Sequence, residues 1–591
     1  MNCMMLFAVL GALPLQEYTE AAAVTFLFAI SEALEQRATA RARNALSDIV
    51  CLRPEYANVI NPVTKDIVVL PANSVAVGTT VSVRPGDKIP CDGTVIEGKS
   101  TIDESSLTGE SRPVNKGVGN PVSGGTINTG NTQLVIKTTA TSNNSAIARL
   151  IGLIEEAQSN RSETEQMVDS FAQIYTPIVI LAAFCMVTIP WAFGNETGKK
   201  WAKMGLITIV IACPCALIIS TPVTYVAGLA AIAQKGVICK GGQHLESLGA
   251  VKSIYFDKTG TLSQGVFALL HFNVVGETRS RKEVLGYLAL MEAPASHPLS
   301  DAIVKGAANE QVDIPQLQLQ NHTLLPGEGI RAQVDGKDVH VGNNKLFQRL
   351  GLYESLPEDV RATTEAWANA GGTTGFISID NDIVGAYCVA DKIRDETKDV
   401  VAALKKMGIE VTMLTGDQRP AAVGIGDQVG LKSNDIRSEL LPEDKLLEIG
   451  NKVKENKQNK NWLSTNKAVM MVGDGVNDAP ALALADVSVA MGEGAALAMD
   501  TADVTLMDSN LTKLLYIIRM GKRVRRTIFE NVAFSLIVKA VVFGFTFSGK
   551  ASLWAAIGSD VGAMLIVTIN GMKLLPRKTK ENDLAASGLK E

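Results

Sequence analysis

The chain has 591 residues, several times the length of an average domain of about 100–200 residues, so more than one domain is expected. Apolar residues make up 46% of the chain, charged residues 20%, and the net charge is −5. This composition argues against extensive disorder and against a nucleic-acid partner. Eight scattered cysteines without a C-x-x-C pair argue against a disulfide framework and suit a reducing compartment.

Six apolar runs are separated by polar blocks, and several of them approach the roughly 20 residues that a membrane-spanning helix needs. They lie near residues 3–15, 21–34, 173–193, 205–232, 531–547 and 551–569. Basic residues cluster just outside these runs, as in GKRVRR before the fifth, and such flanks mark the cytoplasmic side. The sequence therefore predicts an integral membrane protein whose two large polar blocks lie in the cytosol. The first run is short, and we expect the chain to start inside a helix.

The first polar block, about residues 50–140, is predicted to form a small all-β domain. Short runs of Val, Ile and Thr alternate there with turn sequences such as RPGDKIPCDG and SGGTINTG. The second block, about residues 240–525, alternates strands and helices. SIYFD, VTMLTGD and AVMMVGDG each read as a buried strand that stops at a polar loop, as parallel strands do in an open α/β sheet. Residues 266–390 contain two predicted hairpins and read as an inserted second domain.

Three strand ends in the second block carry side chains suited to phosphoryl transfer. Asp257 ends one strand, and a carboxylate there can attack a phosphoryl group while nearby N–H groups and hydroxyls contact the phosphate oxygens. Asp474 ends another strand, and two neighbouring carboxylates form a natural Mg²⁺ site. The loops are expected to meet at the carboxyl edge of the sheet. The other residues predicted there are Thr415, Gly416, Asp417, Lys445, Asn477 and Asp478. Taken alone, Asp257 is equally compatible with a turn-forming role.

The sequences DKTGTLS, LTGD and GDGVNDAP, in this order, resemble the motifs of the P-type ATPases, which belong to the haloacid-dehalogenase-like superfamily. The resemblance implies that ATP phosphorylates Asp257, within the loop that continues through Lys258, Thr259, Gly260 and Thr261. It also implies that the backbone of Thr259 and the carboxylates of Asp257 and Asp474 hold Mg²⁺, and that Lys445 and Thr415 contact the phosphoryl group. Ser263 stands where the family usually has threonine, and because it keeps a hydroxyl we expect little consequence.

DESSLTGES in the first block resembles the actuator loop with which the family hydrolyses the aspartyl phosphate. The resemblance implies that Thr108, Gly109 and Glu110 form this loop and that Glu110 orients the attacking water as an acid/base group. On its own, Glu110 would be interpreted as one more solvated loop carboxylate.

ASHPLS, PGEGI and VGN in the inserted domain resemble the nucleotide-binding motifs of heavy-metal-transporting members. The resemblance implies an ATP pocket in which glycines admit a close approach of the backbone and an imidazole lies near the adenine. Its residues would be His297, Pro298, Gly327, Glu328, Gly329, Gly342 and Asn343. A lone His-Pro pair is more often a surface turn.

The stretch IACPCALIIS places a proline inside an apolar run. Proline removes a backbone donor and leaves a carbonyl near Ile209 or Val210 without its helical partner, a break that is tolerated where it lines a cavity. Cys213 and Cys215 would diverge by about 200° in an unbroken helix, but at a break they can converge on one soft or borderline metal ion. The alternative is that both are small buried residues beside a kink.

Two charged residues lie deep in the last two apolar runs. Lys539 and Asp560 each cost at least ~2.5 kcal/mol at the bilayer centre, so we expect them to face inward and pair. Asp560 would join Cys213 and Cys215 in a mixed sulfur and oxygen site, and Lys539 would provide the counter-charge of the emptied site. This set resembles the branch of heavy-metal P-type ATPases that exports Zn²⁺, Cd²⁺ and Pb²⁺. Copper-exporting relatives, which carry Tyr, Asn, Met and Ser in these spans, are the alternative.

The predicted fold is multi-domain: an α-helical transmembrane bundle, an all-β actuator domain, an α/β haloacid-dehalogenase-like phosphorylation domain and an inserted α+β nucleotide-binding domain. The predicted boundaries are 1–38 for two transmembrane helices, the first partial, 39–165 for the actuator domain, 166–236 for two transmembrane helices, 237–265 and 391–525 for the phosphorylation domain, 266–390 for the nucleotide-binding domain, 526–576 for two transmembrane helices and 577–591 for a tail.

The predicted function is ATP-driven efflux of Zn²⁺, Cd²⁺ or Pb²⁺ through an aspartyl phosphate. ATP, Mg²⁺, the lipid bilayer and a cytosolic metal donor are the expected partners. The family carries two further helices upstream and commonly a cysteine-rich metal-binding domain, so we expect an N-terminally shortened chain. A non-pumping, membrane-anchored metal-binding or regulatory protein is therefore a second alternative. A soluble phosphohydrolase is a weaker one, because it leaves Lys539 and Asp560 unexplained.

Overall fold

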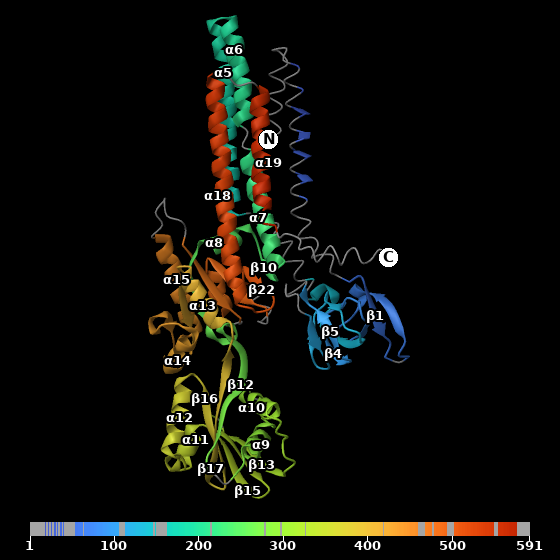
Figure 1. The fold of residues 1–591 in the computed structure, drawn as a ribbon, viewed down its shortest axis with the longest axis vertical. Helices are drawn as coiled ribbons and strands as arrows, with labels where there is room; N and C mark the ends of the chain where they lie inside the picture. Colours follow the sequence, from blue (N-terminus) through green and yellow to red (C-terminus); the bar gives the residue numbers. More distant parts are fainter. Residues whose placement is uncertain are drawn as a thin grey trace. The chain divides into compact units, whose positions relative to one another are not determined.

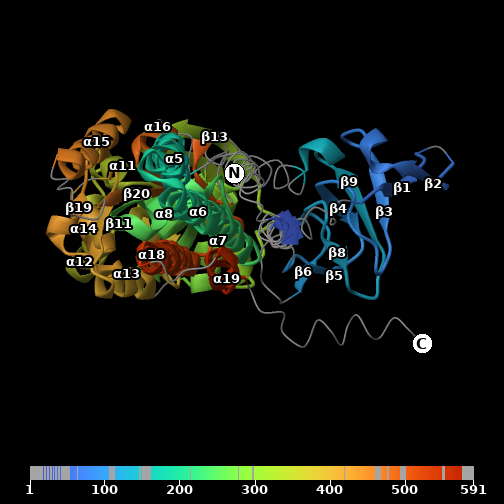
Figure 2. The same ribbon diagram turned by 90° about the horizontal axis from the view of Figure 1, so that it is seen from above.

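The structure is a computed structural model, shown from two directions in Figures 1 and 2. The residues that it describes are single residues between 18 and 40, then 54–62, 64–105, 113–145, 148, 162–212, 215–276, 279–295, 298–325, 327–417, 419–458, 467–474, 478–492, 501–548 and 553–575. The two helices predicted over 1–38 thus lie almost entirely outside the described residues. The chain divides into two compact units, Met1–Ala250 with Asp503–Asp508 and Lys513–Glu591, and Val251–Ala502 with Ser509–Thr512.

The part of the first unit before the helical bundle is built of antiparallel strands. A six-stranded sheet has the order β2-β1-β3-β9-β4-β7, and a three-stranded sheet has the order β6-β5-β8. Alternate side chains of the strands point inward, so that Ile89, Leu134 and Ile136 are fully buried in one core. The all-β prediction for this block is confirmed. The strands are β1 (Tyr56–Ile60), β2 (Ile67–Pro71), β3 (Thr80–Val83), β4 (Gly93–Glu97), β5 (Ser100–Asp103), β6 (Val114–Lys116), β7 (Pro121–Val122), β8 (Ile127–Asn128) and β9 (Leu134–Thr138).

Long apolar helices form the bundle of the first unit (Figure 1). Within the described residues, four helical stretches are long and apolar enough to cross a membrane: Thr164–Phe193, Ala216–Ala233, Thr512–Phe547 and Ala555–Met572. Two transmembrane helices were predicted within residues 166–236. The second of them is divided into α6 and α7 on either side of Pro214, as a helix-breaking proline implies. The helices are α5 (Glu163–Thr188), α6 (Asn195–Ala212), α7 (Cys215–Ala233), α18 (Thr512–Phe547) and α19 (Leu553–Met572).

A buried polar network joins three helices of the bundle. Asn531 of α18 donates hydrogen bonds to the hydroxyl of Ser220 on α7, at 2.7 Å, and to the carbonyl of Val567 on α19, at 3.1 Å. Its own side-chain oxygen accepts a hydrogen bond from Asn570, at 2.8 Å. The amide of Asn531 is therefore satisfied inside an apolar environment, where an unpaired polar group is costly.

The second unit contains a parallel sheet in the order β21-β20-β11-β18-β19. Its strands are β11 (Val251–Asp257), β18 (Glu410–Leu414), β19 (Ile436–Arg437), β20 (Ala468–Gly473) and β21 (Val487–Met491). The helices that accompany them are α13 (Thr397–Lys406), α14 (Arg419–Val429), α15 (Pro442–Gln458) and α16 (Ala479–Leu484). Three predicted buried strands are thus confirmed as the central, mutually parallel strands β20, β11 and β18.

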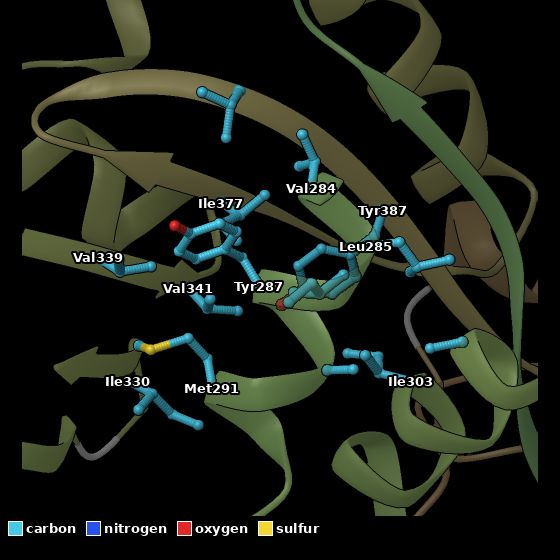
Figure 3. Close-up of a cluster of buried hydrophobic side chains, with 14 of the residues drawn as sticks. Val284, Leu285, Tyr287, Met291, Ile303, Ile330, Val339, Val341, Ile377 and Tyr387 are labelled. Atoms are coloured by element: carbon cyan, nitrogen blue, oxygen red, sulfur yellow. The ribbon is translucent and has the colours of Figure 1, made fainter. Parts of the chain in front are cut away.

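An antiparallel sheet of order β12-β17-β16-β15-β14-β13 forms the inserted part of the second unit. Two-residue turns close its two predicted hairpins. One turn is Asp335 with Gly336 and the other is Asp380 with Asn381, and all four residues have the positive φ that such turns require. Figure 3 shows the core that the sheet shares with α9, including Val284, Val341 and Ile377. The elements are β12 (Ser263–Val274), α9 (Arg281–Glu292), α10 (Pro298–Asn309), β13 (Leu319–Leu325), β14 (Gly329–Val334), β15 (Lys337–Gly342), α11 (Asn344–Arg349), α12 (Glu358–Asn369), β16 (Thr373–Ile379) and β17 (Asp382–Ile393).

Candidate functional site

Three carboxylates meet at the carboxyl edge of the parallel sheet. Asp257 is the last residue of β11, Asp474 follows β20, and Asp478 precedes α16. One oxygen from each lies within 4.8 Å of the others, and Asp257 and Asp478 are buried. Because β11 and β20 are adjacent and parallel, the residues that follow their ends are brought to the same edge.

Lys445 provides a positive charge in this cluster. It lies in the first turn of α15, and its Nζ is 2.5 Å from Oδ1 of Asp257 and 2.9 Å from Oδ1 of Asp478. These are charge-assisted hydrogen bonds, which are shorter and stronger than neutral ones. The structure therefore brings together Lys445 and the strand-end carboxylates, which are far apart in the sequence.

Burial and neighbouring charges shift the pKa values of the groups in this cluster. Burial and the neighbouring charge of Asp478 raise the pKa of Asp257 to about 6, although Lys445 opposes the shift. Burial and Asp478 also raise the pKa of Asp474 to about 6. Burial lowers the pKa of Lys445, but Asp257 and Asp478 outweigh this and raise it overall. Three close carboxylates with one ammonium form a donor set of hard oxygens with excess negative charge, which fits Mg²⁺.

The loop after Asp257 closes onto Asp474. Gly260 has φ +72°, a conformation that favours glycine, and a Cβ at this position would overlap the carboxylate of Asp474. The hydroxyl of Thr261 is fully buried and has no hydrogen-bond partner among the described residues. An unsatisfied buried hydroxyl in the loop that contacts Asp474 fits a site that binds a polar ligand.

Two residues that support this loop were not predicted. Arg394 donates hydrogen bonds from Nε to the carbonyl of Thr261 and from Nη2 to the carbonyl of Gly260, both at 3.1 Å. Asp391 accepts a hydrogen bond from the hydroxyl of Ser263, so this serine hydroxyl is in use. The signal in the sequence was the charged run DKIRDE, which begins where the inserted hairpins end.

The predicted TGD residues lie beside the same loop. Lys258 Nζ is 2.8 Å from Oδ2 of Asp417, and the backbone N–H of Asp417 donates to the hydroxyl of Thr415 at 3.1 Å. A cavity of about 780 Å³ begins at Lys258, Gly416 and Asp417 and reaches as far as Phe267 of β12. Its size is in the range of pockets that bind small molecules. The loop 370–373 forms another part of its wall.

Five of the predicted nucleotide-binding residues lie together where β14 begins and β15 ends. Gly329 and Gly342 are cross-strand partners, and a Cβ on either would overlap backbone atoms of the other strand or its turn. Asn343 donates to the carbonyl of Gly327 at 2.9 Å, and its side-chain oxygen accepts two N–H groups at the start of α11. The carboxylate of Glu328 is paired with Arg349, at 2.6 Å. The glycines therefore have a packing role here, besides any role in ligand binding.

A buried carboxylate on the same inserted part was also missed. Glu292 ends α9 and is 7% exposed, and it accepts a hydrogen bond from the hydroxyl of Ser300 at 2.6 Å. The signal was the glutamate in MEAPASHPLS, five residues before His297. His297 and the side chain of Pro298 lie outside the described residues. The same holds for Thr108, Gly109, Glu110 and Asn477.

In the helical bundle, Lys539 and Asp560 form an ion pair. Nζ of Lys539 is 3.0 Å from Oδ1 of Asp560 and 2.9 Å from the carbonyl oxygen of Ile211, near the end of α6. The predicted pairing of the two charges is confirmed. The sequence predicted that the proline would leave a carbonyl near Ile209 or Val210 without its helical partner. The carbonyl that Lys539 contacts belongs to the next residue, Ile211. Cys213 and the side chain of Cys215 lie outside the described residues, so their convergence stays a prediction.

Known proteins resemble the chain over nearly its full length. Residues 52–155 match the P-type ATPase actuator domain, and residues 251–486 match the haloacid dehalogenase-like hydrolases. A probable cadmium-transporting ATPase of Alkalihalophilus pseudofirmus is 38% identical over 577 residues, which cover 97% of this chain and 78% of that protein. The chain belongs to the P-type ATPase family. A cadmium/zinc-transporting ATPase of Oryza sativa subsp. japonica is 37% identical over 98% of this ATPase, which spans 52% of that longer relative.

Solved structures agree with this assignment. The crystal structure of a zinc-transporting PIB-type ATPase in the E2.Pi state has a TM-score of 0.64 and 33% sequence identity, and the match covers 97% of this ATPase and 90% of that chain. A second crystal structure of a zinc-transporting PIB-type ATPase, in a different state, has a TM-score of 0.59 and 34% identity, with the same coverage of both chains. Members of the family use ATP and Mg²⁺. The apolar helices and the membrane ATPase relatives together identify this ATPase as a membrane protein, and the polar domains between its helices fit catalytic domains in the cytosol.

Proposed function

We propose that this ATPase exports Zn²⁺ and Cd²⁺, and also Pb²⁺, across its membrane at the expense of ATP. The observation that carries the proposal is the ion pair of Lys539 and Asp560 beside the end of α6, because a charged pair inside apolar helices marks an ion pathway. The named relatives transport cadmium or zinc, which supports the same cargo here.

In the proposed reaction a carboxylate oxygen of Asp257 attacks the γ-phosphorus of ATP. A bond forms between that oxygen and phosphorus, the bond to the β–γ bridging oxygen breaks, and ADP leaves. Bound Mg²⁺, held by Asp257, Asp474 and the backbone of Thr259, would neutralise charge on the transferred group. Lys445 holds the Asp257 carboxylate in place, as their 2.5 Å contact supports. Lys258, Thr415, Gly416, Asp417, Asn477 and Asp478 would position the phosphoryl group and the metal.

The aspartyl phosphate is then hydrolysed in the proposed cycle. Thr108 and Gly109 would bring Glu110 to the site, and Glu110 would orient a water and accept its proton. The water oxygen bonds to phosphorus, the bond to Asp257 breaks, and inorganic phosphate leaves. The predicted domain boundaries, with the actuator at 39–165 and the nucleotide-binding domain at 266–390, form part of this proposal.

ATP would bind to the inserted part through the residues predicted for it. His297, Pro298, Gly327, Glu328, Gly329, Gly342 and Asn343 would contact the adenosine end. Support comes from the convergence of five of them around the start of β14 and the end of β15. The cavity of about 780 Å³ at Lys258 and Asp417 offers space for the phosphate end.

The cargo ion would bind to Cys213, Cys215 and Asp560. Thiolates favour soft and borderline ions, and the added carboxylate suits divalent ones, which is why Pb²⁺ is included with Zn²⁺ and Cd²⁺. Lys539 would form an ion pair with the Asp560 carboxylate after the metal ion leaves. Their 3.0 Å contact supports this role. A cytosolic metal donor would deliver the ion, because free soft metal ions are scavenged by thiols.

The decisive experiment measures the ATPase activity of the purified chain in lipid against a panel of Zn²⁺, Cd²⁺, Pb²⁺ and Cu⁺. We expect stimulation by the three divalent ions, none by Cu⁺, and loss of activity in Asp257→Asn and Cys213→Ala. Uptake of labelled zinc into sealed vesicles separates a pump from a protein that only binds metal. Stimulation by Cu⁺ alone would reverse the choice of cargo, and metal binding without ATP-dependent uptake would refute export.

A further inference from the structure

The cytosolic end of α18 carries a row of exposed arginines. Arg519, Arg523 and Arg526 are four and three residues apart, a spacing that places them on one face of a helix. All three are exposed, and the side chain of Arg526 is 81% exposed. Neighbouring guanidinium groups repel one another, so an exposed row of this kind gains energy from a negatively charged partner.

The same face of α18 turns toward lipid further along the helix. Eighteen residues make five turns of an α-helix, so Ile537 projects at the same angle as Arg519, and Val541 at the same angle as Arg523. Ile537 is 63% exposed and Val541 is 52% exposed. Apolar side chains exposed on a membrane-spanning helix contact acyl chains, so the arginine row faces the lipid as well.

The membrane end of the row, at Arg526, reaches the depth of the lipid headgroups. Lys539 is the middle residue of the apolar run 531–547, which places it near the bilayer centre. At 1.5 Å per residue, Arg526 lies about 20 Å and Arg523 about 24 Å from that centre. The hydrocarbon core ends about 15 Å from the centre and the headgroups about 20–22 Å from it. Arg519 lies about 30 Å away along the axis, in water beside the headgroups.

Within the described part of the chain, ion pairs do not neutralise this row. Glu530 lies 2.8 Å from Arg526, but it is also 3.4 Å from Lys573 at the end of α19. One carboxylate is therefore shared by two cations, while Arg519 and Arg523 add two further positive charges. The local excess of positive charge favours lipids with a net negative headgroup over zwitterionic lipids, whose own ammonium compensates the phosphate.

We propose that Arg519, Arg523 and Arg526 form a binding site for anionic phospholipid headgroups of the cytosolic leaflet. Guanidinium groups bind phosphate oxygens with two parallel hydrogen bonds, which a bulk electrostatic attraction does not provide. The lipid would be held at one depth along α18, with its acyl chains over Ile537 and Val541, which are exposed on the same face of the helix.

The test is a titration of the purified chain in detergent with phosphatidylglycerol or phosphatidylcholine, in which native mass spectrometry counts the bound lipids. The test variant carries Arg519→Gln, Arg523→Gln and Arg526→Gln. A matched control removes three positive charges elsewhere, by Lys282→Gln, Lys398→Gln and Lys406→Gln, all exposed positions of the second unit. A third variant replaces the arginines by lysine and keeps the charge.

We expect the unaltered chain and the matched control to bind phosphatidylglycerol in preference to phosphatidylcholine. The triple glutamine variant is expected to lose about fivefold in phosphatidylglycerol affinity per arginine, with binding of phosphatidylcholine unchanged. The lysine variant keeps the charge but loses the paired hydrogen bonds, so it is expected to bind phosphatidylglycerol more weakly than the unaltered chain and more tightly than the glutamine variant. Equal affinity for both lipids in the unaltered chain overturns the proposal, as does an equal loss in the matched control.

Discussion

The amine of Lys539 lies 3.0 Å from a carboxylate oxygen of Asp560, and both residues sit in helices long enough to cross a membrane. Each charge compensates the desolvation of the other. A second contact of Lys539, with the carbonyl of Ile211, ties the pair to the end of α6, close in sequence to Pro214. A helix end before a proline and a charged pair that are far apart in the sequence therefore belong to one site.

Removing one charge of this pair is expected to destabilise the protein more than removing both charges. Lys539→Met leaves the Asp560 carboxylate without its partner, and loss of one member of a buried pair typically costs about 3–5 kcal/mol. The double variant Lys539→Met with Asp560→Asn removes both charges and is expected to recover most of that stability. Thermal unfolding in detergent measures the difference. A double variant that unfolds earlier than the single one contradicts this account.

Lys445→Met is expected to slow phosphorylation of Asp257 by about 10²–10³-fold, because it removes the cation that holds the Asp257 carboxylate in place and offsets the negative charge at the site. Quenching with acid after adding radiolabelled ATP measures the phosphoenzyme directly. Lys452→Met is the matched control, since Lys452 lies on the same helix and pairs with Glu410 at 3.3 Å, away from the carboxylate cluster. Similar phosphorylation rates in both variants would remove Lys445 from the mechanism.

Much of this architecture could be predicted because its signals are local. Carboxylates at strand ends predicted the shared edge of β11 and β20, and the stretches around Asp335 and Asp380 predicted the hairpins, whose turns then adopt positive φ in the structure. Arg394 and Glu292 were missed for a physical reason. Their importance lies in long-range contacts, with the carbonyl of Thr261 in one case and with a buried hydroxyl in the other, and no local pattern encodes such partners.

Gly260→Ala is expected to slow phosphorylation of Asp257 by at least ~10²-fold. A methyl group there would displace the Asp474 carboxylate, besides the strain of a positive φ. Gly276→Ala is a close control, because Gly276 also has positive φ, 81°, but a Cβ there meets nothing within 4 Å. The control is expected to lose a little stability and to phosphorylate normally. Phosphoenzyme assays on both variants separate displacement of Asp474 from backbone strain.

Asn531→Leu is expected to destabilise the bundle by roughly 1–3 kcal/mol, since it leaves the hydroxyl of Ser220 and the carbonyl of Val567 without the hydrogen bonds that Asn531 donates. Ser535→Ala, one turn along the same helix, is the comparison. The Ser535 hydroxyl is buried and has no partner among the described residues, so its removal is expected to be neutral. Chemical unfolding in mixed micelles measures both. Equal losses would show that polarity alone, not the network, matters.

Three buried thiols are expected to resist alkylation at neutral pH. Burial raises the pKa of Cys91 and of Cys388 to about 11 and that of Cys239 to about 12, so the reactive thiolate is scarce at neutral pH. Because the pKa is raised, labelling by iodoacetamide is expected to increase as the pH rises toward these values. Peptide mass spectrometry of chain labelled at about pH 7.5 and about pH 9.5, with a denatured control, checks this. Rapid labelling of these thiols at the lower pH contradicts their burial.

The pairing of β12 with β17 bears on whether the inserted part can be replaced by that of a relative. The inserted part leaves the phosphorylation sheet along β12 and returns along β17, and the two strands are antiparallel neighbours, with Val274 opposite Gly385. Val274 and Gly385, at which a cassette could be cut, therefore lie side by side. A cassette cut between these positions and replaced by the corresponding segment of a relative would leave Asp257, Lys445 and Asp474 in place, so nucleotide preference and phosphoryl chemistry can be exchanged independently.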